Sequence, residues 1–156
     1  MNNPAANLTR AVFAKLDCAG TFLPQLALRL LLAYEFWEAG LGKFRGENWF
    51  ADIQEDFPFP FDVVPVELSW FLATWTELLG AVALVIGLGT RFFSLSLVVL
   101  TVVAWASVHA GQGYNVCDNG FKLPLIYLVM FMPLIFSGPG RLSLDHLLAR
   151  QQAIGR

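Results

Sequence analysis

Charged residues are scarce in this sequence. They make up 14% of its 156 residues, against about 25% in an ordinary soluble domain. The ten basic and twelve acidic residues give a net charge of -2, and no stripe of lysine and arginine appears along the chain. Nucleic acid is therefore not expected as a partner, because a nucleic-acid-binding protein needs a basic face.

Cysteine is nearly absent as well. The two cysteines, Cys18 and Cys117, form no Cys-x-x-Cys motif, which disfavours thiol redox chemistry of the thioredoxin type. The topology predicted below places them on opposite sides of a membrane. They cannot pair within one chain, because a disulfide requires Cα atoms within about 7 Å of each other.

Long hydrophobic runs, in contrast, fill most of the chain. Hydrophobic residues make up 56% of it, and the mean hydropathy is +0.58. Apolar stretches cover about residues 21–42, 66–89, 92–110 and 121–137, each near the ~20 residues that span a bilayer. Gly87 and Gly89 predict a tight turn between the second and third of these stretches, and such short links favour antiparallel neighbours. The sequence thus predicts an all-α, polytopic four-helix bundle in a lipid bilayer, with residues 1–156 as a single domain.

The basic residues between and beyond these stretches predict an orientation. Six lie on the side of the termini and three on the other: Arg10, Lys15, Arg91, Arg141, Arg150 and Arg156 against Lys43, Arg45 and Lys122. By the positive-inside rule, both termini are expected in the cytoplasm, in a bacterial inner membrane. Loops one and three then face outward.

The first of these outer loops, about residues 43–65, is rich in aromatic residues, acids and prolines. Tryptophan and phenylalanine beside acidic residues are typical of a segment at the headgroup level that caps the bundle. The alternative is that the loop acts as a lid, or as a docking surface for an extracytoplasmic partner.

Three carboxylates interrupt the apolar stretches: Glu35, Glu38 and Glu77. A charged side chain in hydrocarbon costs at least about 2.5 kcal/mol, so such residues indicate a functional site by default. The alternative is a structural ion pair with Arg29. Arg29 and Arg91 are predicted to be structural charges.

Helical spacing predicts that several polar and aromatic residues of the four spans converge in the outer half of the bundle. These pocket candidates are Glu35, Glu38, Trp70, Thr74, Glu77, Trp105, His109 and Tyr127. The spans hold three glutamates against one arginine, so protonation, water or a bound cation must balance the excess. Direct or water-bridged contact is expected between His109 and Glu35 or Glu38.

Several short motifs carry a family likeness. From about Leu26 to Asp145 the chain resembles the DoxX family of four-helix membrane proteins, through Ala39-Gly-Leu-Gly-Lys-Phe44, Glu77-Leu-Leu-Gly80, Gly87-Leu-Gly-Thr-Arg91, His109 and Gly138-Pro-Gly-Arg-Leu-Ser-Leu-Asp145. The resemblance implies membrane redox functions, which in the family include a thiosulfate:quinone oxidoreductase, and oxidative-stress complexes. It brings no defined catalytic set.

A second group of motifs resembles one subgroup of DoxX-type proteins. These are Tyr34-Glu-Phe-Trp-Glu38, Asn48-Trp-Phe50, Phe57-Pro-Phe-Pro60 and Gly113-Tyr-Asn115. The likeness implies an association with multinuclear iron oxidases that modify copper-binding peptides.

Three functions remain open from the sequence. The first is a redox-associated subunit whose pocket binds a quinone or a similar apolar ligand, because a carboxylate and an imidazole suit quinone protonation. The second is a copper or iron handler with Glu35, Glu38, Glu77 and His109 as ligands. The third is a membrane anchor for a partner protein. A partner protein or a homo-oligomer is expected, because the chain offers no electron carrier of its own.

Overall fold

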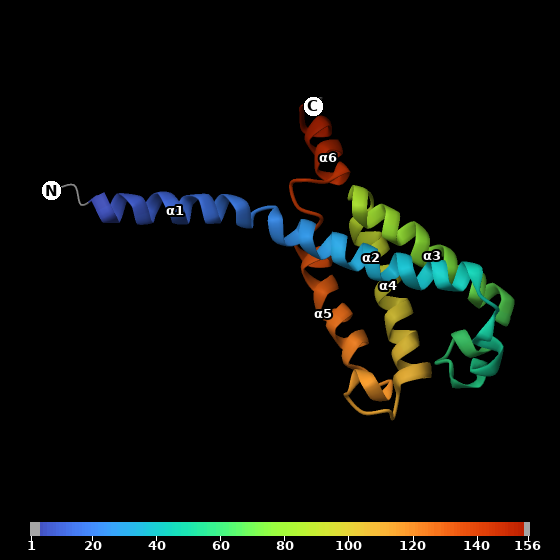
Figure 1. Cartoon of the computed structure of the whole chain (residues 1–156). Helices are drawn as coiled ribbons and strands as arrows, with labels where there is room; N and C mark the ends of the chain where they lie inside the picture. Colours follow the sequence, from blue (N-terminus) through green and yellow to red (C-terminus); the bar gives the residue numbers. More distant parts are fainter. Residues whose placement is uncertain (1–3, 155–156) are drawn as a thin grey trace.

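The chain folds into helices and loops. A computed structural model describes residues 4–154, and this range contains no β-strand. The elements are α1 (Pro4–Gly20), α2 (Leu23–Arg45), α3 (Val66–Ile86), α4 (Thr90–Ala104), which a π-helical turn extends over Trp105–His109, α5 (Lys122–Phe136) and α6 (Leu144–Ile154) (Figure 1). The predicted all-α membrane fold is confirmed.

The helices α2 to α5 form the bundle. Helix α2 packs along α3, and α4 packs along α5, while contacts between α3 and α4 and between α2 and α5 close the ring. In the described chain, Leu8–Arg45, Val66–Ile86 and Thr90–His109 are long and apolar enough to cross a membrane. Helix α5 has 15 residues and is about 22 Å long, which is shorter than a full crossing of about 30 Å.

Small residues let the helices approach closely. A Cβ atom on Gly40 of α2 would lie 3.0 Å from Glu77 and Leu78 of α3, and one on Gly80 would lie 3.0 Å from Leu97 of α4. The core inside the ring is made of apolar side chains from all four helices: Leu32, Ala33, Phe36, Ala81, Leu84, Leu97, Phe131 and Leu134. Glycine at helix contacts is typical of membrane bundles, because packing replaces the hydrophobic driving force there.

The predicted tight turn between the second and third spans is present. Gly87 and Gly89 adopt positive φ angles of 71° and 58°, a region that glycine enters without steric cost. A Cβ atom on Gly87 would also lie 2.5 Å from Ser143 and 2.9 Å from Arg29. The turn therefore requires glycine both for its conformation and for its packing.

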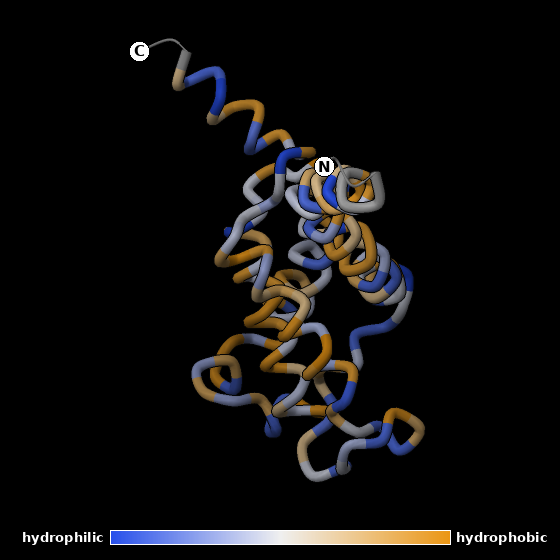
Figure 2. The backbone as a smooth tube through the Cα atoms, turned by 90° about the vertical axis from the view of Figure 1, so that its left-hand side faces the viewer, coloured by the Kyte–Doolittle hydropathy of each residue, from blue (hydrophilic) through white to orange (hydrophobic). Residues whose placement is uncertain are grey.

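The N-terminal end of the chain differs from the sequence prediction. Helix α1, which was not predicted, projects away from the bundle nearly in line with α2 (Figure 1). Arg156, counted in the basic bias, lies outside the described residues. Along the backbone, hydrophobic residues follow the bundle helices, whereas hydrophilic residues gather in the loops and in α6 (Figure 2).

Candidate functional site

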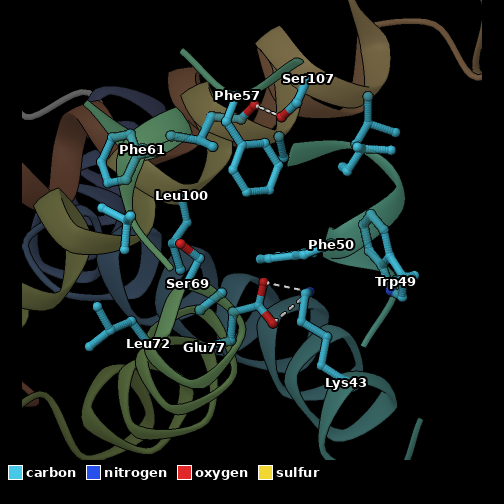
Figure 3. Close-up of a pocket in the computed structure, with 16 residues that line it drawn as sticks. Lys43, Trp49, Phe50, Phe57, Phe61, Ser69, Leu72, Glu77, Leu100 and Ser107 are labelled. Carbon is cyan, nitrogen blue, oxygen red and sulfur yellow. Dashed lines mark hydrogen bonds and ion pairs between the residues drawn. The ribbon is translucent and has the colours of Figure 1, made fainter. Parts of the chain in front are cut away.

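A cavity of about 170 Å³ lies between one end of the bundle and the first loop (Figure 3). It is bounded by the end of α2, the first half of α3, the end of α4 and the loop between α2 and α3. Its lining is mostly apolar and aromatic, and consists of Lys43, Trp49, Phe50, Ile53, Phe57, Phe61, Val64, Ser69, Leu72, Ala73, Glu77, Leu100, Val103, Ala104, Ser107 and Val108.

An ion pair forms one side of this cavity. The Lys43 Nζ atom donates to both carboxylate oxygens of Glu77, at 2.9 and 2.8 Å, and the side chains are only 15% and 8% exposed. Figure 3 shows the two side chains meeting at the cavity wall. Removing one partner of a buried pair costs about 3–5 kcal/mol, because the other charge is then left uncompensated.

The prediction that the spans contain three glutamates against a single arginine needs a correction at Glu77. The first span was expected to end near Gly42, which placed Lys43 in the outer loop. Helix α2 in fact continues to Arg45, and the close approach of α2 and α3 at Gly40 brings Lys43 onto Glu77. The charge of Glu77 is therefore balanced by a lysine of this chain.

Aromatic rings from the first loop close the cavity. The Phe50 ring meets the rings of Trp49, Phe57 and Trp70 edge to face, with centroid distances of 4.9, 5.2 and 5.0 Å. Gln54 holds the loop in shape by donating from its side-chain amide to the Val64 carbonyl at 3.0 Å. The loop covers the cavity at one end of the bundle as an aromatic lid, and this position is also compatible with a cap at the headgroup level.

Two serines lie in the cavity wall, and they differ in one respect. The Ser107 hydroxyl donates to the Val103 carbonyl of its own helix. The Ser69 Oγ atom is buried and has no hydrogen-bond partner among the described residues. A buried hydroxyl without a partner costs about 1–3 kcal/mol, so Ser69 is a polar group available to a bound molecule. The cavity thus offers an ammonium donor, a carboxylate acceptor and a free hydroxyl between apolar walls.

The remaining pocket candidates do not line this cavity. Trp70 belongs to the aromatic lid through Phe50. Thr74 is buried, and its hydroxyl donates to the Trp70 carbonyl. Glu35 accepts a 2.6 Å hydrogen bond from the Tyr127 hydroxyl between α2 and α5, while Glu38 is exposed on α2.

Trp105 and His109 contact the third loop instead of the glutamates. The Trp105 ring stacks on Phe121 at 5.0 Å, and His109 Nδ1 donates to the Asn119 carbonyl at 2.7 Å. In place of the predicted single pocket, the structure has one cavity beside Glu77, a separate Glu35–Tyr127 pair, and a third-loop cluster around Trp105 and His109.

The two arginines expected to be structural lie at the opposite end of the bundle. Arg29 is 1% exposed and donates to the carbonyls of Leu84, Val85, Pro139 and Leu142 at 2.7–2.9 Å. The alternative of an ion pair between Arg29 and a glutamate is therefore wrong. Arg91 makes one longer hydrogen bond, 3.3 Å, to the Phe136 carbonyl.

The structure does not bring the predicted metal ligands Glu35, Glu38, Glu77 and His109 together. Among the described residues, no three histidine, cysteine, aspartate or glutamate side chains are grouped so that they could hold a metal ion. Of the residues that line the cavity, only Glu77 was a predicted pocket residue, and Lys43, Phe50, Phe57 and Ser69 are among those that the sequence did not indicate as such. Lys43, Phe50 and Phe57 stand within the motifs that carry the family likeness, which was the available signal.

The fold and this cavity define a multi-pass helical membrane protein that encloses an ion pair between its spans. The DoxX family matches residues 25–110, and the chain belongs to that family. It is similar to an uncharacterized protein of Haemophilus influenzae, with 51% identity covering 87% of this chain and 90% of the relative. A second uncharacterized protein of that organism is 30% identical, covering 76% and 86% of the two chains. No solved structure matches the chain.

Proposed function

We propose that this protein is a redox-associated subunit of the bacterial inner membrane whose cavity binds the ring of a quinone or a similar apolar ligand. One observation carries the proposal: an aromatic-lined cavity with the Lys43–Glu77 pair in its wall. Small-molecule sites are typically apolar, with a few polar groups that fix the orientation of the ligand.

The size of the cavity limits the ligand. An apolar cavity of about 150 Å³ holds a benzene molecule, so the 170 Å³ here accommodates one six-membered ring with small substituents. An isoprenoid tail would have to leave the cavity toward the bilayer.

The polar groups suit both redox states of such a ring. The Lys43 ammonium donates to the carbonyl oxygen of a quinone, and the Glu77 carboxylate accepts from the hydroxyl of a quinol. The unpartnered Ser69 hydroxyl serves either role. A partner protein or its cofactor carries the electrons to or from the quinone. The likeness to the subgroup associated with iron oxidases suggests such an oxidase as the partner.

The two other functions have weaker support. A metal handler would need a cluster of ligands, whereas Glu35, Glu77 and His109 each bond to a different partner. An anchor that docks a partner through the first loop has only part of its aromatic residues to offer. Phe59 is 82% exposed, whereas Phe50 and Phe57 are packed over the cavity.

The binding test uses the purified protein in mild detergent and a short-tailed benzoquinone. Trp49 and Trp70 lie at the lid, so we expect saturable quenching of tryptophan fluorescence, confirmed by calorimetry. With the reduced form of the probe, the quinol, Glu77→Gln should weaken binding at least about tenfold, because the carboxylate accepts from the quinol hydroxyl. Glu35→Gln, an equally conservative change outside the cavity, is the matched control. Absence of saturable binding, or equal weakening in both variants, would refute the proposal.

The orientation has its own test. Cys18 and Cys117 are both free and exposed. With both termini in the cytoplasm, an impermeant thiol reagent labels Cys117 in intact cells and leaves Cys18 unlabelled until the cells are opened. The reverse pattern would place the cavity on the cytoplasmic side.

A further inference from the structure

A second hollow lies at the other end of the bundle. It is a groove of about 710 Å³ where the start of α2, the start of α4, the α5–α6 linker and α6 meet. Its lining is more polar than that of the cavity, and it consists of Thr21, Gln25, Gly89, Arg91, Phe92, Ser137, Pro139, Gly140, Arg141, Asp145, His146 and Ala149.

The charged side chains in this groove differ in how many hydrogen bonds they form. The single acid, Asp145, accepts hydrogen bonds from the backbone nitrogens of Gly89 and Thr90 at 2.8 and 2.9 Å, so its carboxylate caps the start of α4. Arg141 is exposed and forms no hydrogen bond or ion pair with any described residue. Arg91 uses one N–H on a 3.3 Å bond. A guanidinium has five N–H donors, so most of these donors are available to an anion.

The position of the groove indicates where that anion comes from. Arg91 is the second residue of a helix that is apolar and long enough to cross the membrane, which places it at the headgroup level. Phe92, in the wall of the groove, is 68% exposed, and Phe136 at the end of α5 is 75% exposed. Apolar side chains beside two guanidinium groups match a molecule that has both a phosphate and acyl chains.

We propose that this groove binds the phosphate of an anionic phospholipid headgroup, with Arg91 and Arg141 as the donors. Arginine pairs with phosphate through two parallel hydrogen bonds, and basic pockets between membrane helices suit anionic headgroups. The acyl chains lie against Phe92. This inference is independent of the ligand proposed for the cavity.

The test is native mass spectrometry of the full-length protein in mild detergent. The added probe is phosphatidylglycerol, phosphatidylcholine or inorganic phosphate. We expect retention of phosphatidylglycerol over phosphatidylcholine, and no displacement of that lipid by millimolar phosphate. Arg91→Gln and Arg141→Gln should each weaken binding of phosphatidylglycerol roughly fivefold, and the double variant about thirtyfold. Arg150→Gln removes the same charge from α6 outside the groove and should have no effect.

Equal retention of the two lipids, or a double variant that binds phosphatidylglycerol like the wild type, would overturn the proposal. Displacement of the lipid by inorganic phosphate alone would assign the groove to a free anion and overturn the lipid assignment. If Arg91→Gln disturbs folding, the binding of phosphatidylglycerol to Arg141→Gln tests the proposal by itself, because the Arg141 side chain has no intramolecular hydrogen bond to lose. The Arg91→Lys and Arg141→Lys double variant should keep part of the affinity, since it keeps the charge.

Discussion

Arg29 and Glu77 are both charged, buried and inside the membrane-spanning helices, yet their surroundings differ. Arg29 donates to four backbone carbonyls from two other segments of the chain. Two of these, Leu84 and Val85, belong to the last turn of α3, whose carbonyls have no partner within the helix. The positive charge also complements the negative end of the helix dipole. Arg29 therefore joins α2, the end of α3 and the α5–α6 linker.

Glu77 has one charged partner and an open cavity beside it. Its hydrogen bonds go to Lys43 alone, and the neighbouring wall contains the unpartnered Ser69 hydroxyl. A buried charge with most of its donors bonded to the backbone stabilises the fold, whereas a buried pair next to unused polar groups is available to a ligand. We therefore expect Arg29 to be a structural charge and Glu77 to belong to a ligand site, and variants at the two sites test this difference.

The largest expected effect is on stability, at Arg29. Arg29→Met leaves four carbonyls without their donor, one in a buried and three in partly buried hydrogen bonds, so we expect the free energy of unfolding to fall by about 4 kcal/mol. Arg29→Lys should recover part of this loss, because a lysine donates to at most three of them. Denaturation in mild detergent measures both variants. A loss under about 1 kcal/mol for Arg29→Met would show that the carbonyls find other partners.

The next effect concerns the Lys43–Glu77 pair. Glu77→Gln leaves the Lys43 ammonium buried beside a neutral amide, and we expect a loss of about 3 kcal/mol. Adding Lys43→Met removes the uncompensated charge and should restore most of the stability. Ligand binding should stay impaired in the double variant. If the double variant recovers binding as well, the pair is structural like Arg29, and the contrast between the two sites fails.

The fold was largely predictable from the sequence, because its signals are local. Apolar runs gave the four bundle helices, and Gly87 and Gly89 gave the tight turn. The ends of the helices were predicted less accurately. Helix α2 ends three residues later than predicted, so Lys43 was not counted among the charges that lie within the spans. Helix boundaries depend on packing and capping that a single span does not reveal.

The site was less predictable, because its contacts join distant segments. The partners of Arg29 are backbone carbonyls up to 113 residues away, and no side-chain pattern marks them. The lid depends on a loop whose short 3₁₀ turns place Phe50 and Phe57 over α3. Glu35 and His109 were predicted to lie at a similar depth in the membrane, yet they contact different residues and not each other. Depth alone does not determine which faces of two helices pack together.

A smaller effect on stability is expected at the Glu35–Tyr127 pair. Tyr127→Phe removes one 2.6 Å hydrogen bond and keeps the ring contact with Phe36, whose centroid lies 5.9 Å away. The free energy of unfolding should fall by about 1–2 kcal/mol, because the Glu35 carboxyl group loses this hydrogen-bond partner. Binding in the cavity should not change, because neither residue lines it. Weakened binding in Tyr127→Phe would extend the functional site to this pair.

The smallest change in stability is expected at Ser69. Ser69→Ala removes a buried hydroxyl that has no partner, so the protein should be as stable as the wild type or slightly more stable. Binding of the short-tailed benzoquinone should nevertheless weaken about fivefold, because one hydrogen bond to the ligand, worth about 1 kcal/mol, is lost. Ser107→Ala is the matched control, since that hydroxyl lines the same cavity but is already bonded to Val103. Equal affinities of the two variants, measured by calorimetry, would mean that Ser69 does not contact the ligand, and Lys43 and Glu77 would be the remaining polar contacts.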